Sequence, residues 1–104
     1  MKKSNTIHLC PSTRKEKKWM VILPNEKIVH FGASGYSDYT KHKDKERMMR
    51  YLNRHRKNEN WTKSGIDTAG FWSRWILWNK PSLRDSITHT ENKFNIHIVK
   101  KRKC

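Results

Sequence analysis

Large aromatic side chains are the feature that most limits how this chain can fold. The chain has 104 residues, and only 34% of them are hydrophobic. Five tryptophans, three tyrosines and three phenylalanines offset that shortage, because each aromatic side chain can bury about 150–250 Å². A chain this long is the usual size of one domain, and a disordered chain with so many charges would usually lack aromatics. We therefore expect one small folded domain with an aromatic core.

Short apolar runs predict β-strands near both ends of the chain. Residues 19–23 and 28–31 are rich in β-prone side chains and flank a turn that contains Pro24, which predicts a hairpin. Residues 7–10 can add a strand before this hairpin and make it a three-stranded meander. Residues 96–99 predict a closing strand.

Three segments between these strands predict helices. Residues 41–57 contain no glycine or proline and place apolar side chains at the spacing of one helical face. Residues 68–79 follow, with Asp67 or Thr68 as the N-cap, and a third helix begins after Pro81. The tryptophans of the second helix suit a base-stacking platform, but a chain short of aliphatic side chains needs them inside. The order of elements is that of an α+β fold.

Positive charge is concentrated in separate segments. The chain has 24 lysines and arginines against 9 acidic residues, which gives a net charge of +15. Residues 1–18 carry +5, residues 41–57 carry +6, and the end of the chain carries +4. We therefore divide the chain into a basic segment at 1–18, a folded α+β domain at 19–99 and a basic tail at 100–104. Such a charge repels itself in the compact state, so the expected partner is a polyanion or an acidic protein surface.

One face of the helix predicted at 41–57 is a row of basic side chains. Its members follow one another at spacings of four and three residues: Lys43, Arg47, Arg50, Arg54 and Lys57. Acidic side chains that would form salt bridges along the same face are nearly absent. Such a row can be only a solvated helix face, but it also suits a phosphate backbone, whose neutralisation releases counterions and drives binding. We predict that this row binds nucleic acid.

Two further groups are candidates for the same role. The basic tail suits a nucleic-acid contact, a nuclear-localisation patch or a solubilising end, and it comprises Lys100, Lys101, Arg102 and Lys103. Tyr36 and Tyr39 lie in a predicted turn beside the basic helix, where they can stack on bases or simply pack against the protein. We assign the tail to nucleic-acid binding and treat both tyrosines as candidates for stacking.

The sequence carries no recognisable catalytic motif. Asp38, His42, Asp44 and His55 cluster around the basic helix, and a divalent ion would need carboxylates that converge on one point. The two histidines are thirteen residues apart, which is too far along a helix for them to share one ion, and the two aspartates suit helix caps. We therefore expect no enzyme, no metal and no cofactor, with a metal-dependent nuclease as a remote alternative.

The two cysteines and the apolar runs bear on the compartment. Cys10 and Cys104 form no CxxC pair and no zinc-ligand spacing, so we expect free thiols in a reducing compartment. No apolar stretch approaches the ~20 residues of a membrane span. Met1 is followed by no apolar run of the kind found in secretory signals. The expected setting is therefore the inside of a cell.

A pattern between Lys18 and Ile87 resembles a known family. The pattern includes His30-Phe31-Gly32, Gly35-Tyr36-Ser37-Asp38-Tyr39-Thr40, Gly70-Phe71-Trp72-Ser73-Arg74-Trp75 and Trp78-Asn79-Lys80-Pro81. It resembles an uncharacterised family of small basic proteins of large nucleocytoplasmic DNA viruses, including phycodnaviruses and iridoviruses. The resemblance covers about two thirds of the chain and implies a viral protein made in a host cell, but it implies no activity and no catalytic residues. The chain departs from the family at Glu26, where we expect glycine in the hairpin turn.

Charge and resemblance together lead to two expectations for function. The leading one is a non-enzymatic viral protein, associated with the virion or the genome, that binds nucleic acid, DNA above all, without strong sequence preference. The alternative is a minor capsid or cement protein whose basic faces dock acidic surfaces of capsid proteins. Both place the protein in the virion, and in the host cytoplasm or nucleus during infection. Charge alone does not separate the two.

Overall fold

A four-stranded sheet is the foundation of the fold in the computed structural model, which describes residues 6–104. Its strands are β1 (Thr6–Pro11), β2 (Lys17–Ile22), β3 (Ile28–Ala33) and β4 (His97–Lys100), in the order β3-β2-β1-β4. The first three strands form an antiparallel meander, and β4 pairs in parallel with β1. The predicted hairpin, the added strand at 7–10 and the closing strand are thus all present. Lys2 and Lys3 of the predicted basic segment lie outside the described residues.

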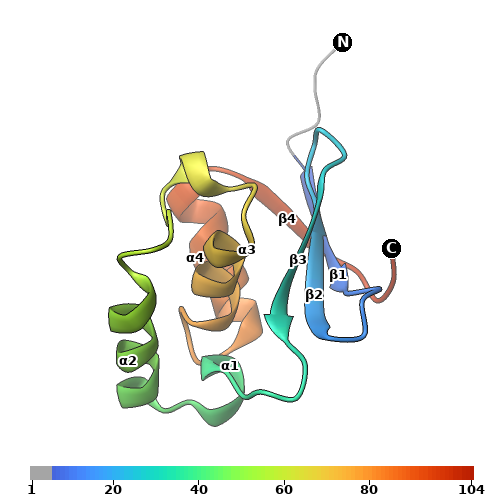
Figure 1. Cartoon of the computed structure of the whole chain (residues 1–104). Coiled ribbons are helices and arrows are strands. Elements are labelled where there is room, and N and C mark those ends of the chain that lie inside the picture. The colour runs from blue at the N-terminus through green and yellow to red at the C-terminus, as the bar shows by residue number, and fades with distance from the viewer. Residues whose placement is uncertain (1–5) are drawn as a thin grey trace.

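The helices lie together on one side of this sheet (Figure 1). They are α1 (Tyr39–His42), α2 (Lys45–His55), η1 (Lys63–Gly65), α3 (Ala69–Trp72), η2 (Ser73–Leu77) and α4 (Leu83–Phe94). The element α3 and its continuation η2, a π-helix, contact the sheet through β3, while α2 lies farther from the sheet. The predicted α+β class is confirmed. Among residues 6–104, no helix is long and apolar enough to cross a membrane.

Aromatic side chains fill the space between the sheet and the helices, as the composition predicts. Trp72 is fully buried, and its indole N–H donates a hydrogen bond to the carbonyl of Ile66 at 2.7 Å. Phe71 packs edge-on against Trp72, and Phe94 of α4 lies 5.0 Å from Phe71 between ring centroids. The sheet contributes the side chains that alternate strand positions turn to its inner face, including Ile7, Leu9, Val21, Val29, Phe31 and Ile98. The second helix therefore serves the core through Trp72 rather than offering that ring to bases.

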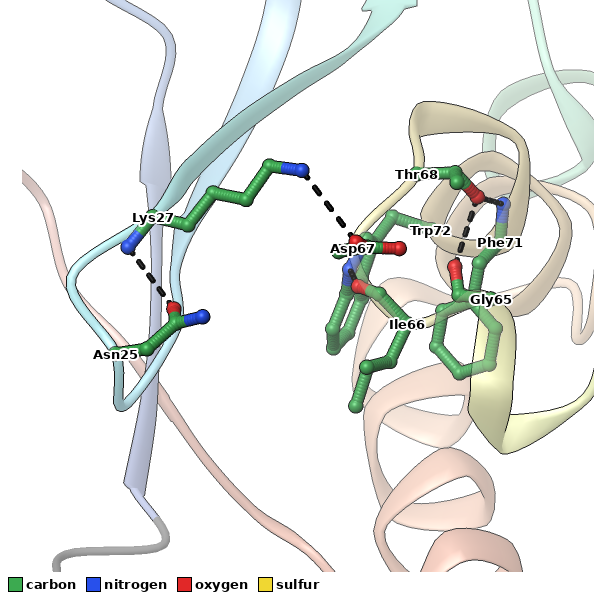
Figure 2. A network of polar contacts seen from close by, with 8 residues as sticks. All are labelled: Asn25, Lys27, Gly65, Ile66, Asp67, Thr68, Phe71 and Trp72. Atoms are coloured by element: carbon green, nitrogen blue, oxygen red, sulfur yellow. Dashed lines mark hydrogen bonds and ion pairs between the residues drawn. The ribbon is translucent and has the colours of Figure 1, made fainter.

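The loop before α3 shows how local signals set the start of this buried helix (Figure 2). Thr68 is the N-cap, since its hydroxyl accepts a hydrogen bond from the backbone N–H of Phe71 at 3.3 Å and donates one to the carbonyl of Gly65 at 2.8 Å. Asp67, the other predicted cap, instead pairs with Lys27 of the β2–β3 hairpin at 3.5 Å. This contact joins the hairpin to the helical layer across 40 residues of sequence.

The helix predicted at 41–57 is broken into two. Lys43 adopts a left-handed backbone conformation, with φ of 56°, and ends α1. Asp44 then begins α2, because its carboxylate accepts hydrogen bonds from the backbone N–H groups of Glu46 and Arg47. An aspartate is among the best N-cap residues, so the absence of glycine and proline did not guarantee one continuous helix.

The expectation of two free thiols is wrong. Cys10 and Cys104 form a disulfide, with 6.0 Å between their Cα atoms. The intervening chain returns to β1 as β4, and the backbone N–H of Lys101 then donates a hydrogen bond to the carbonyl of Leu9 at 2.8 Å. The basic tail is therefore attached to the sheet rather than hanging free. Residues so far apart in sequence meet only because the helical layer brings β4 back beside β1.

The hairpin turn explains why glycine suits position 26. Glu26 has φ of 72°, and its N–H donates a hydrogen bond to the carbonyl of Leu23 at 2.8 Å. Glycine reaches this left-handed region without the steric cost that a Cβ atom brings. The glutamate here accepts that cost in an exposed turn.

Candidate nucleic-acid interface

Helix α2 presents an apolar face to the protein and a basic face to solvent. Met48, Tyr51 and Leu52 are buried, and they pack with Tyr39 of α1 in a small second core. The opposite side carries exposed arginines, at positions 47, 50 and 54. Among residues 6–104, no salt bridge joins any of the three to a carboxylate. The helix thus holds three free cations along roughly 10 Å, at 1.5 Å per residue. We call Arg47, Arg50 and Arg54 the arginine row.

Lys43 and Lys57, the two ends of the basic row predicted from the sequence, lie outside this helix. Lys43 sits in the turn between α1 and α2, and its ammonium donates hydrogen bonds to the carbonyls of Thr40 and Pro81. Lys57 follows the last residue of α2, His55, and is exposed. Lys43 is therefore engaged in joining α1 to the segment before α4, and the arginine row alone has helical geometry.

The cations of the tail are exposed and held in place. Lys100 ends β4, and its ammonium lies 5.7 Å from the centre of the Trp19 ring. Lys101 is hydrogen-bonded to β1 through its backbone, and Arg102 and Lys103 are held between that bond and the disulfide of Cys104. These four cations lie at the end of β4 and in the segment that follows it, and this end of the chain is far from α2 (Figure 1). We call Lys100, Lys101, Arg102 and Lys103 the tail cluster.

The structure separates the two tyrosines that were candidates for stacking. Tyr39 is only 8% exposed and belongs to the core beneath α2, which removes it from the candidates. Tyr36 is 74% exposed in the loop between β3 and α1. A burial difference of this kind depends on the path of the loop, which residue type and spacing do not reveal.

The polar residues near the basic helix have structural partners. Asp38 is 2% exposed, pairs with the Lys18 ammonium at 2.6 Å and accepts the backbone N–H of Thr40 at 2.9 Å as the N-cap of α1. Asp44 is the N-cap of α2, and its own N–H donates to Nδ1 of His42 at 2.9 Å. Both aspartates are thus helix caps, as expected. No group of three or more His, Cys, Asp or Glu side chains in the described part of the chain could hold a metal ion.

A stacked aromatic group joins α2 to Trp78 and was not predicted from the sequence. Tyr51 lies between His55, with 4.2 Å between ring centroids, and Trp78, with 4.3 Å and nearly parallel rings. His55 contacts Glu59 at 3.2 Å, and the Trp61 indole N–H donates to the same carboxylate at 2.9 Å. Burial raises the pKa of Tyr51, so its hydroxyl stays protonated. The spacing of Tyr51, His55 and Glu59 at every fourth residue was the available signal.

Three histidines make the folded state sensitive to acid. Burial is the main cause that lowers the pKa of His30, His42 and His89, and nearby Arg14, Arg47 and Lys80 respectively lower it further. The unfolded chain binds these protons near pH 6.5, while the folded protein resists them. The contribution of these histidines to the free energy of unfolding is therefore fully present above pH 6.5. It is lost as the pH falls below 6.5 toward the lowered pKa values of the folded protein.

We expect the urea midpoint to fall between about pH 7.5 and pH 5, above the range in which exposed carboxylates titrate. Each of the three histidines uses Nδ1 in a hydrogen bond, with Ser12, Asp44 or Asn79. Asparagine places an acceptor close to the position of Nδ1 but does not titrate, so the His30→Asn, His42→Asn, His89→Asn variant is the matched control. A variant with the same pH dependence as the natural protein would contradict this assignment.

Comparison with known proteins gives one match. A family model described as a family of unknown function (DUF5754) matches residues 7–55, which run from β1 to the end of α2. No curated protein and no solved structure matches the chain. The matched residues include the arginine row and the loop that carries Tyr36, but they exclude the tryptophan-rich helix and the tail cluster.

Proposed function

We propose that this chain is a non-enzymatic viral protein that binds nucleic acid, DNA above all, through the phosphates. The observation that carries the proposal is the arginine row, in which three cations without acidic partners in residues 6–104 project from a helix anchored by its other face. Arginine is suited to phosphate because its planar guanidinium donates hydrogen bonds in a fixed fork. A row of cations contacts phosphates and not base edges, so binding is tolerant of sequence.

The disulfide supports a place in the virion. Disulfides persist on virion surfaces and in oxidising compartments, whereas cytosolic thiols are kept reduced. A protein made in the host cytoplasm or nucleus and stabilised by the Cys10–Cys104 bond fits a final location in a particle. The resemblance to small basic proteins of large nucleocytoplasmic DNA viruses points to the same setting.

Charge reversal of the arginine row tests the proposed function. The Arg47→Glu, Arg50→Glu, Arg54→Glu variant is expected to lose measurable binding to a fluorescent DNA duplex near physiological salt, because three phosphate contacts become repulsions. The slope of log K against log salt should also become shallower by about 3, since each phosphate contact contributes about 0.9. Fluorescence anisotropy over a salt series measures both quantities.

A second triple variant controls for the change in net charge. Lys15, Lys63 and Arg84 are exposed and lie outside α2, so their replacement by glutamate changes the net charge by the same amount. At a Debye length of about 8 Å, distant charges are largely screened, so this variant should keep most of its affinity and its salt slope. Equal loss in both variants, or an unchanged affinity in the arginine-row variant with an unchanged melt, would refute the arginine row as the interface.

The tail cluster favours a second candidate, a minor capsid or cement protein. Its cations are held to the sheet by a disulfide, and the tail and α2 lie at opposite sides of the molecule in Figure 1. Two separate basic surfaces suit a protein that docks acidic patches on two capsid subunits. Gentle disruption of particles separates the candidates, because a cement protein stays with the empty shell at a fixed copy number and a genome binder leaves with the DNA.

A further inference from the structure

A hollow of about 850 Å³ lies where β2, the β3–α1 loop and α1 meet. Small-molecule sites commonly have volumes of about 300–1,000 Å³. The walls include two aromatic side chains, Trp19 and Tyr36, and two lysines, Lys17 and Lys41. This combination differs from the arginine row, which offers cations without a flat apolar surface.

The hollow carries a net positive charge. Three lysines and one aspartate line it, so the formal charge is +2. Lys18 and Asp38 neutralise each other, because their charged atoms are 2.6 Å apart and their side chains are only 13% and 2% exposed. In the described part of the chain, no salt bridge engages Lys17 or Lys41. These two ammonium groups are therefore available to an anionic ligand.

The aromatic walls add a requirement for a flat ring. Tyr36 is largely exposed although its ring is apolar, while Trp19 is packed on one side by the core. The hydroxyls of Ser34 and Ser37 line the same space. An acidic peptide would use the lysines but leave the aromatic rings without a partner. A nucleotide satisfies both, since its base stacks on an aromatic ring and its phosphate pairs with an ammonium group.

We propose that this hollow binds one nucleotide of a single strand, with the base against Tyr36 and a phosphate between Lys17 and Lys41. The inference rests on the proposed function and deepens it, because bases of a duplex are stacked and paired and cannot reach the ring without being flipped out. Thr40 and Lys41 line the hollow, and α2 begins four residues later at Lys45. A strand that leaves the hollow along α1 therefore comes to the helix that carries the arginine row.

The Tyr36→Ala variant tests the stacking. It should bind a short single-stranded oligothymidine about tenfold more weakly, while its affinity for a duplex stays within about twofold. Tyr36→Phe keeps the ring and should restore single-strand binding. Ile28 is also exposed and apolar but lies on β3 outside the hollow, so Ile28→Ala is the matched control and should bind both probes normally.

A mononucleotide separates this inference from the proposed function, because it is too short to depend on the arginine row. Deoxyadenosine monophosphate should shift the NMR signals of the Trp19 indole N–H and the Gly35 amide, and inorganic phosphate should leave the indole signal in place. If neither signal moves and Tyr36→Ala binds single strands normally, the inference is overturned, whatever the arginine-row variant shows. If the mononucleotide shifts both signals while the protein binds no duplex, nucleotide binding in the hollow is supported and the arginine row is refuted as a duplex interface.

Discussion

Reduction of the Cys10–Cys104 disulfide is expected to destabilise the protein by about 4–5 kcal/mol. The bond closes a loop with a sequence separation of 94 residues, and loops of this length lose the most conformational entropy when they are cross-linked in the unfolded chain. A domain of this size has a free energy of unfolding of only about 5–15 kcal/mol. The melting temperature, followed by circular dichroism with and without dithiothreitol, should fall by roughly 15 °C or more.

The Cys104→Ser variant separates loss of the bond from effects of the reductant. Cys104 is exposed and Cys10 is buried, so this change removes the disulfide while leaving the core cysteine in place. The variant should melt like the reduced protein, and dithiothreitol should not change it further. Equal melting temperatures for the oxidised protein and for Cys104→Ser would contradict the structural role of the bond. Mass spectrometry after alkylation confirms the oxidation state of each sample.

Asp38→Ala is expected to cost about 3 kcal/mol, the second largest effect. The change leaves the Lys18 ammonium mostly buried without its partner at 2.6 Å, and removal of one member of a buried ion pair costs roughly 3–5 kcal/mol. It also removes the N-cap of α1, where Asp38 accepts the N–H of Thr40. We place the effect at the lower end because the Lys18 side chain is 13% exposed and water can reach it. Urea unfolding at neutral pH measures the loss.

A double-mutant cycle shows whether the pair itself is responsible. Lys18→Met removes the charge but keeps the length of the side chain, so the Lys18→Met, Asp38→Ala variant should be more stable than Asp38→Ala alone. The single variant Lys18→Met leaves Asp38 buried with only its helix-capping contacts and should also be destabilised. Additive losses would mean that the two side chains are not coupled and would contradict the ion pair seen at 2.6 Å.

Much of the fold follows from short patterns in the sequence. Strands appear where β-prone runs flank turns, and capping residues precede the apolar segments: Thr68 caps α3, and Ser82, directly after Pro81, caps α4 by accepting the N–H of Asp85. These features depend on interactions within a few residues, so a local pattern contains the information that decides them. A local failure is the break at Lys43, where the capping preference of Asp44 competes with a helical pattern that runs through it.

The candidate interface was also only partly predictable from the sequence. The arginine row was predictable, because the helical period that buries Met48 and Leu52 necessarily turns Arg47, Arg50 and Arg54 toward solvent. The role of Lys43 at the start of the predicted row was not predictable, because its ammonium donates a hydrogen bond to the carbonyl of Pro81, a residue 38 positions away. The hollow was equally hidden, since Trp19 and Tyr36 share a wall only once the loop after β3 has taken its path.

The sequence by itself therefore determined the strands, the helices, the aromatic core and the outward direction of the arginine row, because each depends on period and on near neighbours. Only the tertiary structure decided the parallel pairing of β4 with β1, the bond between Cys10 and Cys104, and the different exposure of Tyr36 and Tyr39. Each of these depends on where the chain returns in space after turns whose angles no spacing of residue types encodes. For this protein, the tertiary structure attaches the basic tail to the sheet and places Tyr36 of the predicted turn beside Trp19 in a candidate nucleotide site.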